Sequence, residues 1–260
     1  MPDNASALAP NPGNLYIGRG KLYLDIFTAG TTTRTGELDL GNVTSLELTM
    51  KDDVKEKYES MDHSSLLYGR APTRRTVEIK VVGDEYSLEN LANVMMGDQG
   101  TISQTGATVT GETITASAVQ GRYYPTAKRK ISAVTVKVAS VSKTLGTDYT
   151  IDAETGRIYI VPGGGIAAAA TVTCDYTYAT IALKTVRAAN QATLNGYLRF
   201  VGDPVVGPTY ELEVWNINFT PEGNMGFIAD DFGNWTLSGM CIADLINHPN
   251  EPYYRVINRQ

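Results

Sequence analysis

The segment Ser87-Leu-Glu-Asn-Leu-Ala-Asn-Val-Met-Met96 decides the fold, because its helical periodicity stands between stretches that alternate like β-strands. Ser87 is a residue type that caps a helix N-terminus, and Glu89 adds a negative charge in the first turn, where the helix dipole favours it. The residues spaced to share one apolar face are Leu88, Leu91, Ala92 and Met95. We therefore predict one short helix that ends at Gly97.

Strands with one apolar and one polar face are predicted on both sides of this helix. Before it, three stretches alternate strictly, and their apolar positions are Leu22, Leu24, Ile26, Leu46, Leu48, Met50, Val77, Ile79 and Val81. After residue 186 the alternation returns at residues 194–201, 210–219 and 235–242. This pattern is typical of antiparallel strands that bury one face, so the chain is predicted to be mainly β.

A charged segment, residues 51–75, separates two of these strands and shows no strand pattern. We predict a long loop, and loops of this length inside a compact domain are usually functional or disordered. Its basic and acidic side chains nearly cancel, and its apolar members are Val54, Tyr58, Leu66, Leu67 and Tyr68. Two interpretations remain open: a docking loop with a few apolar anchors, or a solvated helix or loop.

Residues 98–186 change character, because Thr, Ala, Val and Gly dominate there. Short strands are predicted at residues 131–139, 149–151, 158–161 and 172–178, and Asp152-Ala-Glu-Thr-Gly156 reads as a turn with glycine at a positive-φ position. We expect a small, Ig-like β-sandwich inserted into the main domain, which would comprise residues 1–97 and 187–260. Arms outside the core are predicted at both ends, around Pro10, Pro12 and Tyr16 and around Pro249, Pro252 and Arg259.

Composition bounds the possible functions. The chain has 260 residues, 42% of them hydrophobic and 19% charged, which is ordinary globular composition. Its formal net charge of -6 and pI near 5.0 argue against a sequence-independent grip on nucleic-acid phosphates. No apolar window of membrane-spanning length is present and Met1 to Asn14 lacks secretory-signal features, so we expect a protein that is soluble and intracellular when synthesised. Cys174 and Cys241 are predicted to be buried thiols rather than a disulfide.

Catalytic interpretations are weak. Glu211 and Glu213 lie two residues apart and so share a strand face, which could form a glycosidase pair, but a solvated or channel-facing role is favoured because such pairs normally come from different strands. His63 and His248 have no second metal ligand at a recognisable spacing and are expected at the surface. The glycines of Gly18-Arg-Gly20 stand inside a strand pattern, and Asp52-Asp53 and Asp230-Asp231 are expected to be loop acids. We predict no enzyme activity, catalytic residues, metal or cofactor.

The order of these parts resembles the major tail tube proteins of long-tailed, non-contractile bacteriophages (siphophages). The resemblance rests on a strand, a charged loop containing Lys57-Tyr-Glu-Ser60, a strand rich in Thr and Val, and the helix of residues 87–97. Within the insertion, Leu145-Gly-Thr-Asp-Tyr-Thr-Ile-Asp152 and Thr155-Gly-Arg-Ile-Tyr-Ile160 resemble extra segments found in some of these proteins. The similarity covers most of the chain, although no single motif is diagnostic.

The resemblance implies a tail-tube-type antiparallel β-sandwich or barrel with one flanking helix, assembled into stacked hexameric rings. It implies a location in the virion tail after synthesis in the host cytoplasm, and tape-measure and tail-terminator proteins as partners. DNA would pass through the channel without specific binding, and no membrane would be involved. The long loop would contact the next ring through Lys57, Tyr58, Glu59, Tyr68, Arg70 and Arg74, and the candidates for the channel wall are Glu47, Glu78, Glu211 and Glu213.

A second function class remains open. A cell-surface or carbohydrate-binding β-sandwich module is also compatible with a mainly β chain of this length. The missing secretory signal favours the self-assembling structural protein.

Overall fold

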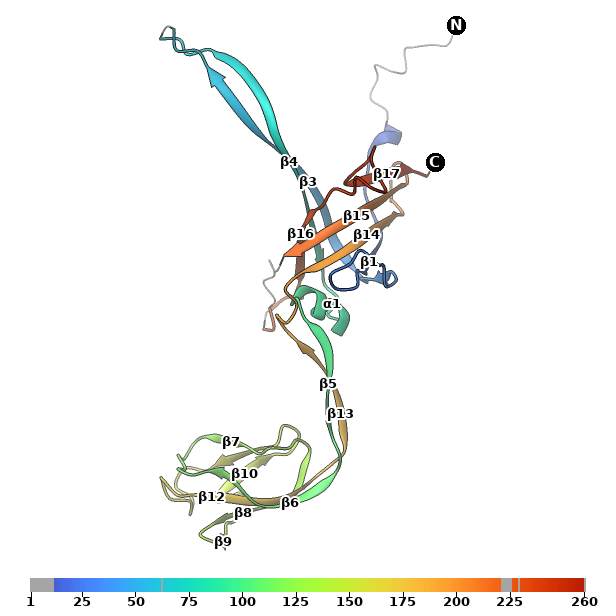
Figure 1. Cartoon of the computed structure of the whole chain (residues 1–260). Helices are drawn as coiled ribbons and strands as arrows, with labels where there is room; N and C mark the ends of the chain where they lie inside the picture. The colour runs from blue at the N-terminus through green and yellow to red at the C-terminus, as the bar shows by residue number, and fades with distance from the viewer. Residues whose placement is uncertain (1–11, 62, 221–225, 229, 260) are drawn as a thin grey trace. The chain divides into compact units, whose positions relative to one another are not determined.

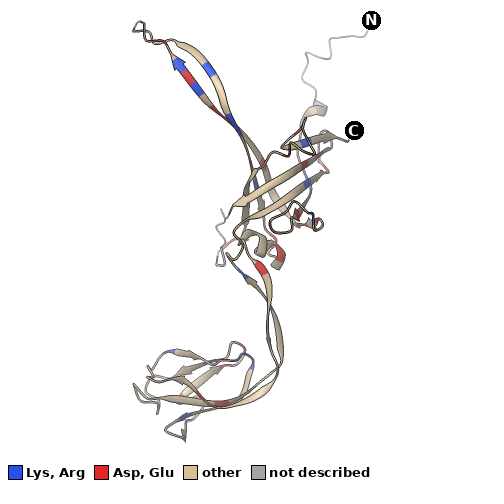
Figure 2. Cartoon of the chain, in the orientation of Figure 1, with Lys and Arg blue, Asp and Glu red and all other residues tan. Residues whose placement is uncertain are grey.

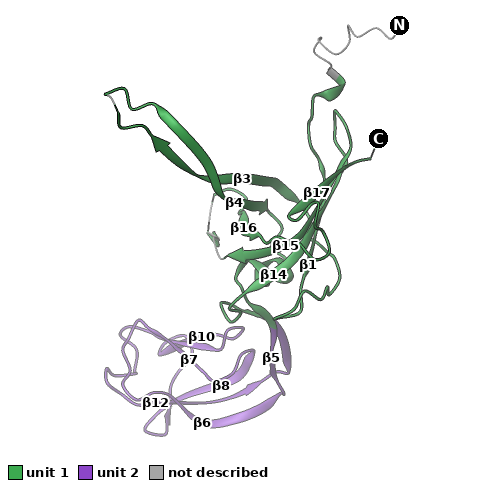
Figure 3. Cartoon of the chain, turned by 45° about the horizontal axis from the view of Figure 1, so that its top comes forward, with its two compact units in different colours: residues 1–99, 186–260 green, residues 100–185 purple. Residues whose placement is uncertain are grey.

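The computed structural model describes residues 12–61, 63–220, 226–228 and 230–259, and within them the chain is mainly antiparallel β with one α-helix (Figure 1). The predicted mainly β class is therefore confirmed. The chain forms two compact units, residues 1–99 with 186–260 (unit 1) and residues 100–185 (unit 2), shown in Figure 3. The predicted domain boundaries, 97/98 and 186/187, differ from this division by one or two residues.

Unit 1 contains the main sheet. Its elements are a 3-10 helix Pro12–Asn14, β1 Gly20–Ile26, β2 Leu38–Asp39, β3 Val43–Tyr58, β4 Leu67–Gly83, α1 Leu88–Val94, β14 Leu194–Gly202, β15 Tyr210–Thr220, β16 Trp235–Cys241 and β17 Tyr254–Asn258. The strand order is β2-β1-β14-β15-β16-β4-β3, and β17 pairs with β15. Residues at the starts of β1 and β3 line one cavity of about 210 Å³, although these strands lie near opposite ends of the strand order. The sheet is therefore strongly curled, and its two ends lie close to each other.

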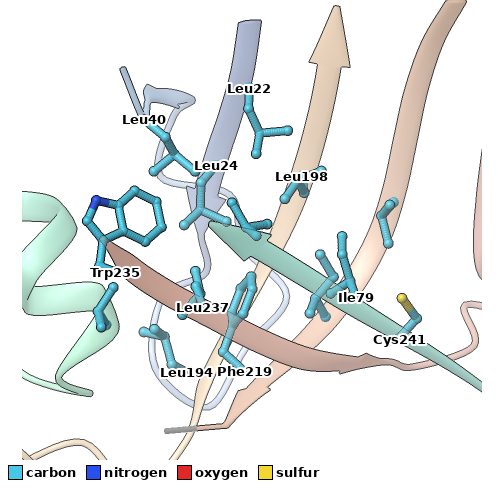
Figure 4. Packing of buried hydrophobic residues seen from close by; sticks show 14 of the residues in the cluster. Leu22, Leu24, Leu40, Ile79, Leu194, Leu198, Phe219, Trp235, Leu237 and Cys241 are labelled. Atoms are coloured by element: carbon cyan, nitrogen blue, oxygen red, sulfur yellow. The ribbon is translucent and has the colours of Figure 1, made fainter. Parts of the chain in front are cut away.

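The concave side of this sheet encloses the core of unit 1. Figure 4 shows Trp235, Phe219 and Leu198 converging with leucines of β1 and β16. Val77, Ile79 and Val81 are at most 1% exposed, as their alternation predicts. Met50, the last apolar position of the alternating strand that contains Leu46 and Leu48, is 50% exposed. Full burial of large apolar side chains contributes about 1.5–3 kcal/mol each, so this cluster is the main stabilising feature of unit 1.

Helix α1 forms where the sequence predicts it, but its buried face differs. The Ser87 side chain accepts a hydrogen bond from the backbone N–H of Asn90, as expected of the cap. Ala92, Val94 and Met96 are buried, whereas Leu88 is 38% exposed. The helix has only two turns, and Met96 leaves it with φ +49°, which turns its side chain into the core. Gly97 is predicted to end the helix, but its role is to let the backbone of Arg187 approach closely. A Cβ at residue 97 would lie 2.3 Å from the carbonyl oxygen of Arg187.

The predicted long loop at residues 51–75 is wrong. β3 and β4 continue through this segment as one long hairpin, closed by a turn in which the Glu59 N–H donates to the Leu66 carbonyl. β16 pairs with β4 only from Glu78 to Gly83, so the outer part of the hairpin has no further strand partner among the described residues. Neither face of the outer part is covered by the core, so apolar residues need not alternate there and the period-two signal is lost.

The C-terminal arm is also part of the sheet rather than outside the core. β17 pairs with β15 from Tyr210 to Val214, directly beyond the stretch that β16 occupies. At the other end, Ile17 forms an isolated bridge with Val206 and Tyr16 contacts the ring of Tyr210. The predicted N-terminal arm around Pro10 falls within residues 1–11, which lie outside the described residues.

Unit 2 consists of two small antiparallel sheets around its own core. Residues 98–187 contain nine strands, of which the first and last belong to neither sheet: β5 Asp98–Gln104, β6 Ala107–Thr115, β7 Tyr123–Pro125, β8 Ile131–Val138, β9 Val141–Ser142, β10 Tyr149–Asp152, β11 Arg157–Ile160, β12 Val172–Tyr178 and β13 Ile181–Arg187. One sheet has the order β6-β12-β8-β9 and the other β10-β11-β7. Both contribute to a cluster that includes Val136, Ile158, Ile160 and Val172. Gly156 has φ +71°, as the turn prediction requires.

β5 and β13 form a separate two-stranded ribbon that joins the units. The first two residues of β5 and the last two residues of β13 belong to unit 1. Asp98 is ion-paired with Arg187 and hydrogen-bonded to Asn190 at the base of this ribbon. This ribbon is not predicted from the sequence. Among the helices of the described residues, none is long and apolar enough to cross a membrane.

Candidate functional site

The outer part of the β3–β4 hairpin places the predicted docking residues on two strands and a turn. Lys57 and Tyr58 end β3, Glu59 lies in the turn, and Tyr68, Arg70 and Arg74 lie on β4. Opposite charges face each other across the ladder in the pairs Asp52–Arg75 (2.8 Å), Glu56–Arg70 (3.6 Å) and Asp53–Arg74 (4.0 Å). These six residues of the charge run therefore form cross-strand pairs. Figure 2 shows basic and acidic residues along this hairpin.

Apolar side chains collect at the far end of this hairpin. Tyr68 is 80% exposed, Met61 92% and Leu66 62%, and Tyr58 and Leu67, which face each other in the register, are each 51% exposed. An isolated two-stranded hairpin is at best marginally stable in water. The exposed end is therefore a candidate contact surface, which we call the hairpin tip and define as Tyr58–Met61 and His63–Tyr68.

Glu47 and Glu78 lie together on the outward face of β3 and β4. They line a cavity of about 470 Å³ that also includes Lys51 and Lys80. The Lys51 ammonium is 2.6 Å from the Glu78 carboxylate, and Lys80 stands opposite Glu47 in the register. This face has one lysine for each glutamate, so the part of it that carries the channel-wall candidates Glu47 and Glu78 is not acidic overall.

Glu211 and Glu213 share a face of β15, as their spacing predicts, but Glu213 is buried and Glu211 is only partly exposed. Glu213 is only 8% exposed, and its carboxylate accepts hydrogen bonds from Arg255 Nη2 (2.6 Å) and from the Tyr197 hydroxyl (2.9 Å). Arg199 lies 3.5 Å from Glu213 and 3.8 Å from Glu211. The solvated role expected of this pair is corrected for Glu213, because Arg199 on β14 and Arg255 on β17 compensate its charge; the channel-facing role stays a prediction.

This cluster perturbs the ionisation of its members. Burial opposes ionisation of Glu213, but the hydrogen bonds from Arg255 and Tyr197 outweigh it, and the pKa of the carboxyl is lowered. Burial and the adjacent Glu213 carboxylate raise the pKa of Tyr197 to about 12 against the opposing effect of Arg199, so the phenol stays protonated and donates. On β1, burial likewise opposes ionisation of Asp25, but hydrogen bonds from Arg34, Thr35 and Gly36 lower its pKa.

A cavity of about 630 Å³ in unit 1 was not anticipated from the sequence. Its walls come from the segment after β1, the outward faces of β14 and β15, and residues 243–248 between β16 and β17. Trp215 is 9% exposed and stacks on His248 with ring centroids 3.6 Å apart, so His248 is not a free surface histidine. One feature of the sequence indicates this cavity: Trp215 lies on the polar face of β15, and a large apolar ring on that face needs other residues to shield it from water.

The aromatic rings in this cavity do not form an open sugar platform. His248 covers one face of Trp215, and the Arg34 guanidinium lies 3.9 Å from the ring centroid of Tyr197. Tyr197 is 4% exposed and Phe27 8%. Stacking on a pyranose needs an exposed ring face, so this geometry does not favour the carbohydrate-binding alternative.

The remaining candidates have structural explanations. Cys174 and Cys241 are free and buried, as predicted, and burial raises the pKa of each thiol to about 12. His63, Asp230 and Asp231 are exposed. Within the described ranges, no three residues of the types His, Cys, Asp and Glu gather in a way that could hold a metal ion.

Comparison with known proteins gives a family but no activity. No curated protein matches the chain. Residues 15–254 match the model of a family described as "Protein of unknown function UCP028589", and this match includes both units and the whole hairpin. Because the match spans most of the chain, the protein belongs to this family of unknown function.

Proposed function

We propose that this chain is a structural protein that assembles with copies of itself into stacked rings, forming the tail tube of a siphophage. The observation that carries the proposal is the outer β3–β4 hairpin. Residues 67–77 of β4 pair only with β3 among the described residues, and the end of the hairpin exposes tyrosine, leucine and methionine side chains. A partner that covers this end would remove apolar surface from water at about 25 cal/mol per Å².

The finer parts of the proposal rest on the resemblance in the sequence. They are the tail-tube type of sandwich or barrel, the Ig-like character of unit 2, hexameric symmetry, location in the virion, and tape-measure and terminator proteins as partners. The curled sheet with one short helix at its edge is compatible with such a subunit. The charges of the outward face are largely paired, so DNA would pass a nearly neutral wall without specific binding.

Shortening the hairpin tests the proposal. Residues 54–73 are replaced by Asn-Gly, which closes the register pair Asp53 and Arg74 with a two-residue turn and keeps the Asp52–Arg75 ion pair. The full chain at high concentration should give rings and tubes in negative-stain electron microscopy, and the shortened chain should give monomers or single rings. Tubes of normal length from the shortened chain would contradict the role of the hairpin.

A matched control removes a different part of the chain. Residues 100–185 are replaced by Asn-Gly, which closes the ribbon near the Asp98–Arg187 ion pair. Unit 1 has its own core, so this variant should fold and assemble like the full chain. If the full chain itself stays monomeric in sedimentation across protein and salt concentrations, the proposed function fails.

A further inference from the structure

We propose that the cavity beside Trp215 receives the hairpin tip of a second copy of the chain. The proposal rests on the proposed function and adds to it the surface that the hairpin contacts. At about 630 Å³ the cavity exceeds four others in unit 1, of about 470, 430, 210 and 110 Å³. It lies within the roughly 300–1,000 Å³ typical of clefts that enclose a compact ligand.

The mouth of the cavity exposes apolar side chains that the chain itself does not cover. Residues 243–252 leave the sheet between β16 and β17 and return beside it, with the Asp244 N–H donating to the Pro252 carbonyl at 2.8 Å. Such a closed excursion is an Ω-type loop, a class that is frequently functional. Leu245 is 66% exposed and Ile246 91%, and both line the cavity.

The floor of the cavity is fixed, so the site is preformed. The indole N–H of Trp215 donates to the Glu251 carbonyl at 2.7 Å, and the ring stacks on His248. Asn216 also lines the floor, and its buried side-chain oxygen has no hydrogen-bond partner in the part of the chain that is described. Within that part, this oxygen is an unsatisfied acceptor, the kind of group with which an incoming hydroxyl such as that of Tyr68 would pair.

The hairpin tip and the mouth of this cavity both expose apolar side chains. The tip is a convex end carrying Leu66, Tyr68 and Met61, all more than half exposed, whereas the cavity is concave with apolar side chains at its mouth. Other exposed apolar groups, such as Phe227 with Phe232 or Leu15 with Val205, line none of the cavities described above. Pairing the tip with the cavity removes both exposed apolar surfaces from water at once.

The occupant must come from a second copy. Figure 1 shows the outer hairpin projecting away from the body of unit 1, and about seven residues of strand beyond the Asp52–Arg75 ion pair place the tip roughly 20 Å further out. The tip and the cavity are different surfaces of one chain, so their contact is heterologous. Unless two copies exchange tips reciprocally, such a contact leaves a free tip and a free cavity on the outermost copies and continues to further copies, until it closes into a ring or extends as a stack.

Engineered cysteines test the contact directly. Leu66→Cys and Leu245→Cys replace side chains that are 62% and 66% exposed, so folding should be unaffected, and the native cysteines are buried. After oxidation, the double variant should give a ladder of disulfide-linked multimers on a non-reducing gel. An equal mixture of the two single variants should give mainly cross-linked dimers, because each chain then has one cysteine in the contact.

The matched control is Leu66→Cys with Val205→Cys, since Val205 is 62% exposed on another surface of unit 1. It should give at least tenfold less cross-linked product. An equal yield from this control would overturn the proposed pairing. Electron microscopy of the same samples separates the two proposals: tubes without the Leu66–Leu245 cross-link refute the cavity assignment alone, whereas no assembly and no cross-link refute the proposed function and the inference with it.

Discussion

Replacing Glu213 by glutamine tests whether the buried carboxylate fastens β17 to the sheet. The carboxylate is 8% exposed and accepts from Arg255 at 2.6 and 3.1 Å and from Tyr197 at 2.9 Å. Glutamine has nearly the same shape as glutamate but no charge. Its amide N–H₂ group would also replace one carboxylate oxygen and face a donor, Arg255 or Tyr197, in place of an acceptor. Hydrogen bonds to charged groups contribute about 1.5–3 kcal/mol, and the arginines can regain water, so we expect unit 1 to lose about 2 kcal/mol.

The assay is urea unfolding followed by tryptophan fluorescence. Both tryptophans, Trp215 and Trp235, lie in unit 1, so the signal reports that unit alone. For a unit of about 170 residues, a loss of about 2 kcal/mol corresponds to a melting temperature roughly 4–8 °C lower. Glu211→Gln is the matched control: its nearest arginine atoms are 3.8 and 3.9 Å away, so we expect a change within about 0.5 kcal/mol.

The pH dependence of this difference has a fixed sign. The folded-state pKa of Glu213 lies below its ordinary value of 4.5, so the carboxylate contributes its stabilisation above that value and loses it as the pH falls through the lower folded-state pKa. The gap between wild type and Glu213→Gln should therefore be full at neutral pH and close in acid. A gap below about 0.5 kcal/mol at pH 7, or an equal loss in Glu211→Gln, would refute the assignment.

Three further predictions concern the two units and the helix. Leu198→Ala and Ile160→Ala each leave a cavity at a fully buried site, so each should lower the free energy of unfolding of its own unit by about 2–5 kcal/mol. Leu198→Ala should shift the unfolding transition of unit 1, seen by tryptophan fluorescence, and Ile160→Ala should shift only the transition of unit 2, seen by far-UV circular dichroism. A shift of both transitions by either variant would contradict independent units. Gly156→Ala should destabilise unit 2 by at least about 2 kcal/mol, because φ is +71° and the new Cβ would lie 2.0 Å from the Lys128 carbonyl oxygen, whereas Gly111→Ala, at φ +70° but with open space, should cost about 1–2 kcal/mol. Ser87→Ala should lower the stability of unit 1 by about 1 kcal/mol in urea unfolding through loss of the helix cap, and Ser87→Asp should restore it.

The sequence by itself determined the mainly β class, the position of the helix and the inserted unit. Strict alternation at Val77, Ile79 and Val81 identifies a strand because one face of that strand is buried and the other is wet. The cap at Ser87 and the glycine turn ending at Gly156 are local requirements of the backbone, so a single segment is enough to reveal them.

Only the tertiary structure decided the features that depend on partners distant in sequence. The outer hairpin carries no strand signal because neither of its faces is buried, and its charges are explained only when Asp52 is seen opposite Arg75. Likewise, the sequence favours a solvated or channel-facing role for Glu211 and Glu213, because the arginines beside them, Arg199 and Arg255, come from other strands and leave no local signal. The cavity beside Trp215 is assembled from segments more than 200 residues apart, and no local pattern records that kind of proximity.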